Sequence, residues 1–297
     1  MINKSGDLRM IITIVGLGVV GASYGLALKD KNIEVYGIDI DYKVLKKAKN
    51  MNIIKDGFIY NSIQSKDIIS RSDILIISIY PRKIKEFIEG YKSYFSEELI
   101  ITDVTGVKER LVSELELILP NHVDFIFAHP MAGREKKGID YASADVFKEA
   151  NFIITPTKKN KERNIEVVED LAKQMGFLNI NKVSPREHDC IISFTSQLPH
   201  VLAVSLINSD DLTFDTGSFI GDSYRELTRI ANINEELWTE LFLENKENLL
   251  RRIENFEKEL LKIRQCLLKG DDETLKEIFR EATRRREKLK FIDKYKK

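Results

Sequence analysis

The chain has 297 residues, 43% of them apolar and 32% charged, and its 47 Lys and Arg residues balance its 47 Asp and Glu residues. This length suffices for about two domains with buried cores. The zero net charge argues against a protein that binds nucleic acid or an anionic membrane, since both normally require a basic surface. We therefore expect a small-molecule partner, with no nucleic acid and no membrane.

The two cysteines, Cys190 and Cys266, lie far apart without a CxxC pattern. Neither a disulfide framework nor a metal site is indicated, and a cytoplasmic location is expected. Residues 10–28 carry no charge and superficially resemble a signal peptide or membrane helix. Four glycines interrupt this run, so a strand, a tight turn and a helix explain it better.

Short runs rich in β-branched residues alternate with amphipathic segments through the first half of the chain. Strands are predicted at residues 10–15, 33–39, 73–79, 99–103, 124–128, 151–155 and 178–180. Helices are predicted at residues 42–50, 83–95 and 161–175. This alternation is typical of βαβ units, so we predict an α/β fold with a doubly wound, mostly parallel sheet.

The pattern changes at Ser184, which is followed by Pro185 and, three residues on, by Glu187. A hydroxyl, a proline and a carboxylate at these positions are typical of a helix start. We place the domain boundary here. Residues 1–183 are predicted to form the dinucleotide-binding domain, and residues 184–297 an all-α domain.

The longest predicted helix covers residues 234–269, where apolar side chains recur at steps of 3 and 4 from Ile253 to Leu267. Gly270 ends it, and a second helix returns over residues that include Leu275 and Phe279. A helix of this length is too long for one small domain to bury. We therefore expect it to pack against its return helix and against a second copy of the chain, giving a homodimer.

The sequence Gly16-Leu17-Gly18-Val19-Val20-Gly21 follows a predicted strand and opens a predicted helix. Its glycines permit a tight turn, close approach of a pyrophosphate, and close packing of helix on strand. Asp39 ends the next strand, where a carboxylate binds the ribose hydroxyls of NAD and repels the 2′-phosphate of NADP. No Arg or Lys stands at residues 40–42, so NAD is expected. A glycine turn without a cofactor is the alternative.

Three further segments carry candidate site residues. Thr105 and Gly106 follow the strand at 99–103, where they either border a ligand or cap a helix. His129 stands at the mouth of another strand as a candidate base, or is a hydrogen-bonded core residue. His200 precedes an apolar helix and either faces the interdomain cleft or caps that helix.

The remaining candidates lie in the helical half and near polar segments. Arg225 and Arg229 are one helical turn apart, suited to binding carboxylates or to pairing on a solvent face. Trp238, the one tryptophan, has the spacing of a core residue. His122 and His188 stand among polar residues and are expected at the surface.

Taken together, these motifs resemble the prephenate dehydrogenases of tyrosine biosynthesis. The segments that carry the resemblance are, in family order, GLGVVG with Asp39, DVTGVK, HPMAG with Glu135 and Lys136, SQLPH, and RELTRIA followed by Trp238. It implies a Rossmann domain followed by an α-helical dimerisation domain. It further implies NAD-dependent oxidative decarboxylation of prephenate to 4-hydroxyphenylpyruvate, CO₂ and NADH.

The resemblance also implies roles for individual side chains. His129 corresponds to the group that deprotonates the ring hydroxyl, and Arg229 to the anchor of a substrate carboxylate. His200 and Glu135 line the pocket, and Trp238 reaches it from the neighbouring subunit. The family often has Ser where this chain has Gly106, so Thr105 or a water is expected to supply that hydroxyl.

Three alternatives stay open from the sequence. Arogenate, which carries an ammonium in place of the side-chain ketone, competes with prephenate as the substrate. A β-hydroxyacid-type dehydrogenase would instead use a catalytic lysine on a helix of the second domain. A non-enzymatic, NAD-responsive binding module would bind the cofactor without turning over a cyclohexadienol.

Overall fold

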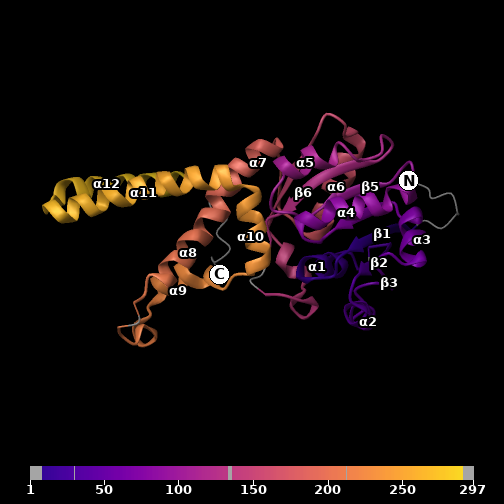
Figure 1. Ribbon diagram of the computed structural model, residues 1–297, viewed down its shortest axis with the longest axis horizontal. Helices are drawn as coiled ribbons and strands as arrows, with labels where there is room; N and C mark the ends of the chain where they lie inside the picture. The colour runs from indigo at the N-terminus through magenta and orange to yellow at the C-terminus, as the bar shows by residue number, and fades with distance from the viewer. Residues whose placement is uncertain (1–8, 30, 133–135, 212, 290–297) are drawn as a thin grey trace.

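The computed structural model describes residues 9–29, 31–132, 136–211 and 213–289. Figure 1 shows two parts, a sheet flanked by helices on the right and a set of helices on the left that ends in a long hairpin. The sheet part is built from the first half of the sequence, and the helical part from the residues after the eighth strand.

Eight strands form one sheet in the order β3-β2-β1-β4-β5-β6-β7-β8. All neighbours pair in parallel except β6 and β7. The predicted α/β class with a mostly parallel sheet is confirmed. The strands are β1 Met10–Val15, β2 Ile33–Asp39, β3 Asp56–Ile59, β4 Ile74–Ile77, β5 Ile100–Asp103, β6 Asp124–Pro130, β7 Asn151–Thr155 and β8 Asn179–Lys182.

Six helices cover the two faces of this sheet, as parallel connections require. Side chains of α1, α2 and α6 join one apolar cluster with Ile12 and Ile14 of β1, and those of α3, α4 and α5 join a second cluster with Ile11 and Val15. The helices are α1 Val19–Leu28, α2 Tyr42–Asn50, α3 Ile63–Arg71, α4 Pro81–Tyr91, α5 Glu109–Leu115 and α6 Glu162–Met175. Strand β3 and helix α3 were not predicted, because each is short and has only a weak apolar pattern.

The helical half begins as the sequence predicts. Ser184 and Glu187 form a reciprocal capping box, with Pro185 in the first turn of the helix. A π-helical turn, Ser193–Gln197, then connects to a helix that contains Pro199, whose missing N–H interrupts the regular ladder. The helices of this half are α7 Pro185–Ile192, α8 Leu198–Asn208, α9 Asp222–Thr228, α10 Glu235–Glu244, α11 Lys246–Lys269 and α12 Asp272–Lys288.

The predicted single helix over residues 234–269 is wrong, because the chain breaks at Asn245 into α10 and α11. The two run in different directions in Figure 1. Asn245 is buried, and its Nδ2 donates to the carbonyl of Asp189 (2.9 Å) and to Oε1 of Gln197 (2.9 Å). Its backbone has left the helical region (φ −118°, ψ 25°), and its side chain holds the break by donating to α7 and to the π-helical turn.

The helical run Pro185–Asn208 is long and apolar enough to cross a membrane, judged by length and composition alone. Its charged residues lie in the first turns, and residues 190–208 form a second uncharged run, besides residues 10–28, that the sequence patterning did not single out. Only 28% of its most apolar window is buried within the chain, so most of its surface is left open to another contact. Its buried Gln197 donates from Nε2 to the carbonyl of Leu241 in α10 (2.9 Å), which ties this run to the rest of the helical half.

Candidate functional site

The site lies at the carboxyl ends of the central strands. The strand order reverses between β1 and β4, and ligands of open α/β sheets bind beside such a switch point. Gly16 follows β1, Asp103 ends β5, and His129 is the last residue but one of β6. The sequence therefore brings the glycine motif and the candidate base to the same edge of the sheet.

Each glycine of the motif has a separate structural reason. Gly16 has a positive φ of 86°, and a Cβ there would strike the carbonyl of Ser78. A Cβ on Gly21 would strike the carbonyl of Gly16. A Cβ on Gly18 would meet nothing within 4 Å among the described residues. No side chain of these residues caps the start of α1. Open space beside the free N–H groups of a helix start fits a dinucleotide pyrophosphate.

We expect Gly18→Ala and Gly21→Ala to fail in different ways. Gly18→Ala should leave the melting temperature unchanged or slightly higher, yet raise the KM for NAD by about tenfold or more, because only the cofactor needs this space. Gly21→Ala should lower the stability by about 1–3 kcal/mol, because its methyl group meets backbone. Thermal unfolding and NAD titration of both variants test this. A Gly18→Ala protein that binds NAD like the wild type would contradict it.

Asp39 stands at the end of β2, close to the glycine turn. Its Oδ2 accepts a hydrogen bond from the N–H of Leu17 (2.8 Å) and its Oδ1 one from the N–H of Asp41 (2.9 Å). A carboxylate has about four acceptor sites, so both oxygens can still accept from ribose hydroxyls. The residues of this edge therefore fit NAD, as the sequence predicts.

We expect Asp39→Ser to raise the use of NADP relative to NAD, because it removes the charge that repels the 2′-phosphate. The ratio of kcat/KM for the two cofactors measures this preference. Asp41→Ser is the matched control, since Asp41 accepts from the N–H of Lys43 at the start of α2 and serine can keep that cap. Unchanged strict use of NAD in Asp39→Ser would show that another group sets the choice.

A buried ion pair lies under the site. Nζ of Lys108 is 2.5 Å from Oδ2 of Asp103, and both side chains are fully buried. Oδ1 of Asp103 accepts from the N–H of Ala128 (3.0 Å), the residue before His129. The hydroxyl of Thr105 hydrogen-bonds to Asp103, to Nζ of Lys108 and to the carbonyl of Val107. Thr105 thus lies within this network, and its expected contact with substrate stays a prediction.

His129 is linked to the helical half through a second histidine. Its Nδ1 is 2.9 Å from Nε2 of His188, and Nδ1 of His188 is 2.7 Å from Oδ1 of Asp189. His188 is fully buried, so its predicted surface position is wrong. In α7 it shares the buried side with Asp189 and Ile192, where α7 packs against α5. The spacing of His188 and Ile192, one turn apart, was the signal that could have placed it inside.

Burial lowers the pKa of His129 well below its usual value of 6.5, and the neighbouring His188 and Lys108 lower it further. A lowered pKa means that the imidazole stays neutral at more acidic pH. We therefore expect kcat to be constant from pH 8 down past 6.5, and to fall only below the lowered pKa, as the base becomes protonated. A pH profile of kcat measures this, and an acid limb centred above pH 6.5 would contradict it.

Helix α10 carries the other wall of this region. A Cβ on Gly106 would lie 3.7 Å from Cε1 of His129 and 3.3 Å from a methyl group of Leu241, so α10 passes close to His129. One turn earlier, the ring of Trp238 lies against that of His200 of α8, with centroids 3.6 Å apart and planes tilted by 30°. Nδ1 of His200 donates to the carbonyl of Ser196 (2.9 Å). The structure thus brings His200 and Trp238 together within one chain.

The last two predicted substrate-binding residues are Arg229 and Glu135. Arg229 is exposed and begins a short 3₁₀ turn, Arg229–Ala231, which packs against α8, the helix of His200. Glu135 lies outside the described residues. Nearby in sequence, Nζ of Lys137 is 3.5 Å from Oε1 of Glu235 in α10. This contact places Lys137 beside the helix that carries Trp238.

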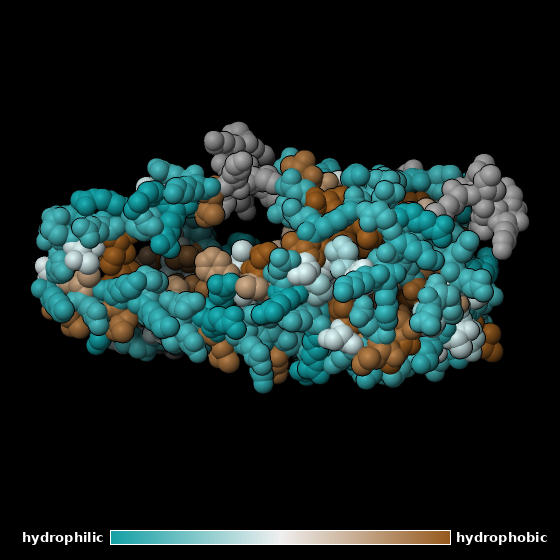
Figure 2. Space-filling view, turned by 90° about the horizontal axis from the view of Figure 1, so that it is seen from above, coloured by the Kyte–Doolittle hydropathy of each residue, from teal (hydrophilic) through white to brown (hydrophobic). Residues whose placement is uncertain are grey.

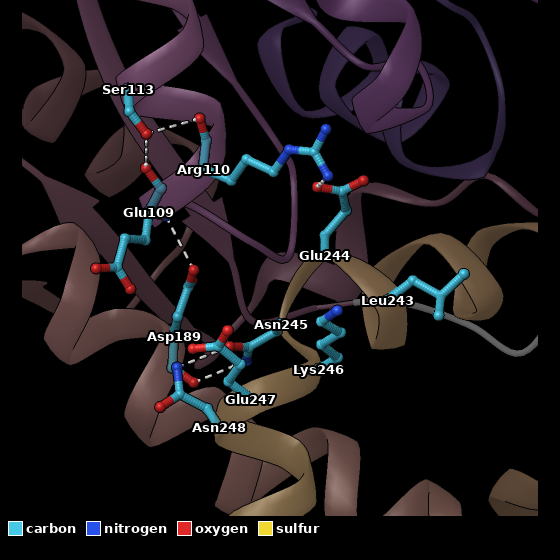
Figure 3. A pocket seen from close by; sticks show the side chains of 10 residues that line it. All are labelled: Glu109, Arg110, Ser113, Asp189, Leu243, Glu244, Asn245, Lys246, Glu247 and Asn248. Atoms are coloured by element: carbon cyan, nitrogen blue, oxygen red, sulfur yellow. Dashed lines mark hydrogen bonds and ion pairs between the residues drawn. The ribbon is translucent and has the colours of Figure 1, made fainter.

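A polar pocket of about 320 Å³ lies where α5, α7 and the break between α10 and α11 meet (Figure 3). There, Asp189 faces Glu109 at the start of α5, and Arg110 reaches Glu244 (2.9 Å). Glu244 also contacts Nε of Arg82 in α4 (3.4 Å). These ion pairs join the two halves of the chain beside the residues that support His129.

Comparison with known proteins decides the family. Two family models match the chain, "Prephenate dehydrogenase, nucleotide-binding domain" over residues 24–180 and "Prephenate dehydrogenase, dimerization domain" over residues 184–281. The chain belongs to the prephenate dehydrogenase family. The resemblance in the sequence motifs is confirmed, and so is the fold of a nucleotide-binding domain followed by a helical domain.

Individual members of the prephenate dehydrogenase family are similar over nearly the whole chain. Prephenate dehydrogenase of Bacillus subtilis is 30% identical over 285 residues, which cover 93% of this chain and 75% of the relative. Cyclohexadienyl dehydrogenase of Zymomonas mobilis is 29% identical, covering 94% and 96%. The crystal structure of A. aeolicus prephenate dehydrogenase with hydroxyphenyl propionate and NAD⁺ superimposes with a TM-score of 0.85 at 30% identity, covering 95% of this chain and 98% of that one.

Proposed function

We propose that this chain catalyses the NAD-dependent oxidative decarboxylation of prephenate to 4-hydroxyphenylpyruvate, CO₂ and NADH. The observation that carries the proposal is the place of His129, a half-buried imidazole with a lowered pKa at the end of β6, at the same sheet edge as a glycine turn and carboxylate that fit NAD. The chain is an NAD-dependent dehydrogenase of the family that its two domains match.

The reaction asks little of the protein beyond orientation and one proton transfer. When bound, NAD supplies the hydride acceptor. His129 accepts the proton of the ring hydroxyl while hydride leaves the same carbon, which makes that carbon a ketone. Loss of the ring carboxylate as CO₂ then makes the ring aromatic, and the phenolate oxygen takes back a proton. The chain holds these groups in line and excludes water, which supplies the rest of the rate enhancement.

Arg229, His200 and Trp238 form the substrate side of the proposed site. Prephenate carries two carboxylates, and a guanidinium binds a carboxylate through two parallel hydrogen bonds. Arg229 is the proposed anchor for one of them. The paired rings of His200 and Trp238 lie on α8, which packs against the turn of Arg229, and on α10, whose Leu241 lies near Gly106 and His129.

A homodimer through the helical half is part of this proposal. None of the described side chains of α12 is buried, and Leu260, Leu261 and Leu268 of α11 are exposed. Figure 2 shows apolar side chains gathered in a hollow of the helical half, on the left of the view. Exposed apolar side chains gathered on one surface are typical of a protein–protein interface. In the dimer, each helical hairpin packs against the partner.

The direct test follows NADH absorbance with prephenate and, separately, with arogenate, each in the presence of NAD or NADP. We expect turnover with prephenate and NAD. Arogenate is the competing substrate, and a higher kcat/KM for arogenate would replace prephenate with it. NAD binding without turnover of either compound would refute the enzymatic proposal and leave a binding module.

A further inference from the structure

We propose that His188 and Asp189 are positioning residues that fix the tautomer of His129, holding the ring proton on Nδ1 so that Nε2 is the free, basic nitrogen. The proposal deepens the proposed function, since it rests on His129 as the base. Both positioning residues come from α7 of the helical half, whereas His129 comes from the sheet. The base would therefore be set by contact between the two domains.

The argument starts at Asp189, which is buried and accepts three hydrogen bonds. Its Oδ1 accepts from the N–H of Lys108 (2.8 Å), its Oδ2 from the N–H of Glu109 (2.9 Å), and Nδ1 of His188 lies 2.7 Å from Oδ1. Both carboxyl oxygens thus accept from backbone N–H groups, and a carboxylate offers acceptors only. Nδ1 of His188 must therefore carry a proton and donate it.

The direction of the hydrogen bond from His188 to Asp189 then determines the direction of the one between His129 and His188. Burial is the largest effect on His188 and lowers its pKa, so the ring is neutral and holds one proton. That proton is on Nδ1, which leaves Nε2 of His188 as an acceptor. Nδ1 of His129, 2.9 Å away, must donate to it. A neutral His129 with its proton on Nδ1 has no proton on Nε2, the nitrogen that a general base needs.

The charged groups around these hydrogen bonds act on the charge state of the two imidazole rings. Nζ of Lys108 bonds to Asp103 and to the hydroxyl of Thr105 and so supplies a positive charge beside both rings. A nearby positive charge disfavours an imidazolium. Asp189 and Asp103 act in the opposite sense on His188, but burial is the largest effect and its pKa is lowered. At Gly106, where the family often has a serine, this chain offers His129 no side chain at all. His188 is thus the described partner that orients the ring.

The first test reads the tautomer directly, by NMR of the full-length chain labelled with ¹⁵N-histidine and without substrate. Two variants, His129→Asn and His122→Asn, help to assign the signals. We expect Nδ1 to be protonated and Nε2 unprotonated in both His129 and His188. A proton on Nε2 of His129 would overturn the inference. Because no turnover is needed, this result is independent of whether prephenate is the substrate.

The second test is kinetic, with His188→Leu and Asp189→Asn. Without an acceptor at Nδ1, nothing holds the proton of His129 there. We expect kcat to fall on the order of 10²-fold in each variant, with KM for prephenate within about twofold, as in other sites where a buried carboxylate orients a catalytic histidine. His122→Leu is the matched control, because His122 is an exposed histidine bonded to the carbonyl of Phe95.

The affinity for NAD and the melting temperature report whether each variant is folded. A folded His188→Leu protein that binds NAD and keeps a wild-type kcat would overturn the inference. So would a His129 whose ring proton stays on Nδ1 in that variant. If the variant does not fold, the NMR spectrum of the wild-type chain decides the question alone.

Discussion

Replacing His129 with asparagine is expected to lower kcat by roughly 10²- to 10⁴-fold and to change KM little, because it removes a proton acceptor that acts only in the transition state. Asparagine keeps a polar side chain of similar reach, so the fold and the binding of both substrates should persist. Initial rates of NADH formation over a range of prephenate concentrations separate kcat from KM.

His122→Asn serves as the control for this substitution. His122 is exposed and lies at the opposite end of β6 from His129, so kcat should be that of the wild type. An unchanged kcat in His129→Asn would dismiss His129 as the base. A large rise in KM with unchanged kcat would make His129 a binding group only.

Replacing Arg229 with alanine is expected to raise the KM for prephenate by roughly 10- to 100-fold and to change kcat less. The guanidinium binds a carboxylate that is present both in the bound substrate and in the transition state, so its loss weakens both. Arg229 is exposed in the described chain, and exposed ion pairs are weaker than buried ones, which sets the upper end of this range.

Arg225→Ala is the matched control for Arg229→Ala. Arg225 lies one helical turn earlier, is also exposed, and pairs with Asp222 at 2.5 Å. Its loss should leave KM within about twofold of the wild type. If both variants behaved alike, the positive charge of the segment as a whole, and not Arg229, would attract the substrate.

The cofactor edge of the site could be predicted from sequence, because its geometry is local. The glycine turn spans six residues between a strand and the helix that follows. Gly21 meets the carbonyl of Gly16 within that unit, Gly18 faces open space, and only Gly16 meets a distant residue, Ser78 after β4. Asp39 reaches the turn because parallel β1 and β2 place their carboxyl ends side by side. The apolar periodicity of the strands and helix, together with the glycines of the turn, is enough to place such residues.

The support of His129 could not be predicted in the same way. His188 is preceded by Arg186 and Glu187 and followed by Asp189, which is a polar context typical of a surface. Only the packing of α7 on α5, elements about 70 residues apart in the sequence, makes that face of the helix interior. The polar side chains are buried because they satisfy one another, which no pattern of apolar residues reveals.

The break at Asn245 was hidden for a related reason. Apolar spacing continues from α10 into α11, and asparagine is tolerated within helices, so periodicity alone predicts one continuous helix. The buried amide instead bonds to Asp189 and Gln197, two residues that lie far away in the sequence. Hydrogen bonds to distant residues thus end the helix at Asn245 despite its continuous apolar spacing, and α10 runs past His129.

A crystal structure of the chain with NAD and the product 4-hydroxyphenylpyruvate tests the proposed catalytic site most directly. We predict that the product hydroxyl lies within hydrogen-bond distance of Nε2 of His129 and that its carboxylate pairs with Arg229. A product bound with its ring away from His129, or with Arg229 turned out of the same cavity, would contradict the proposed catalytic site.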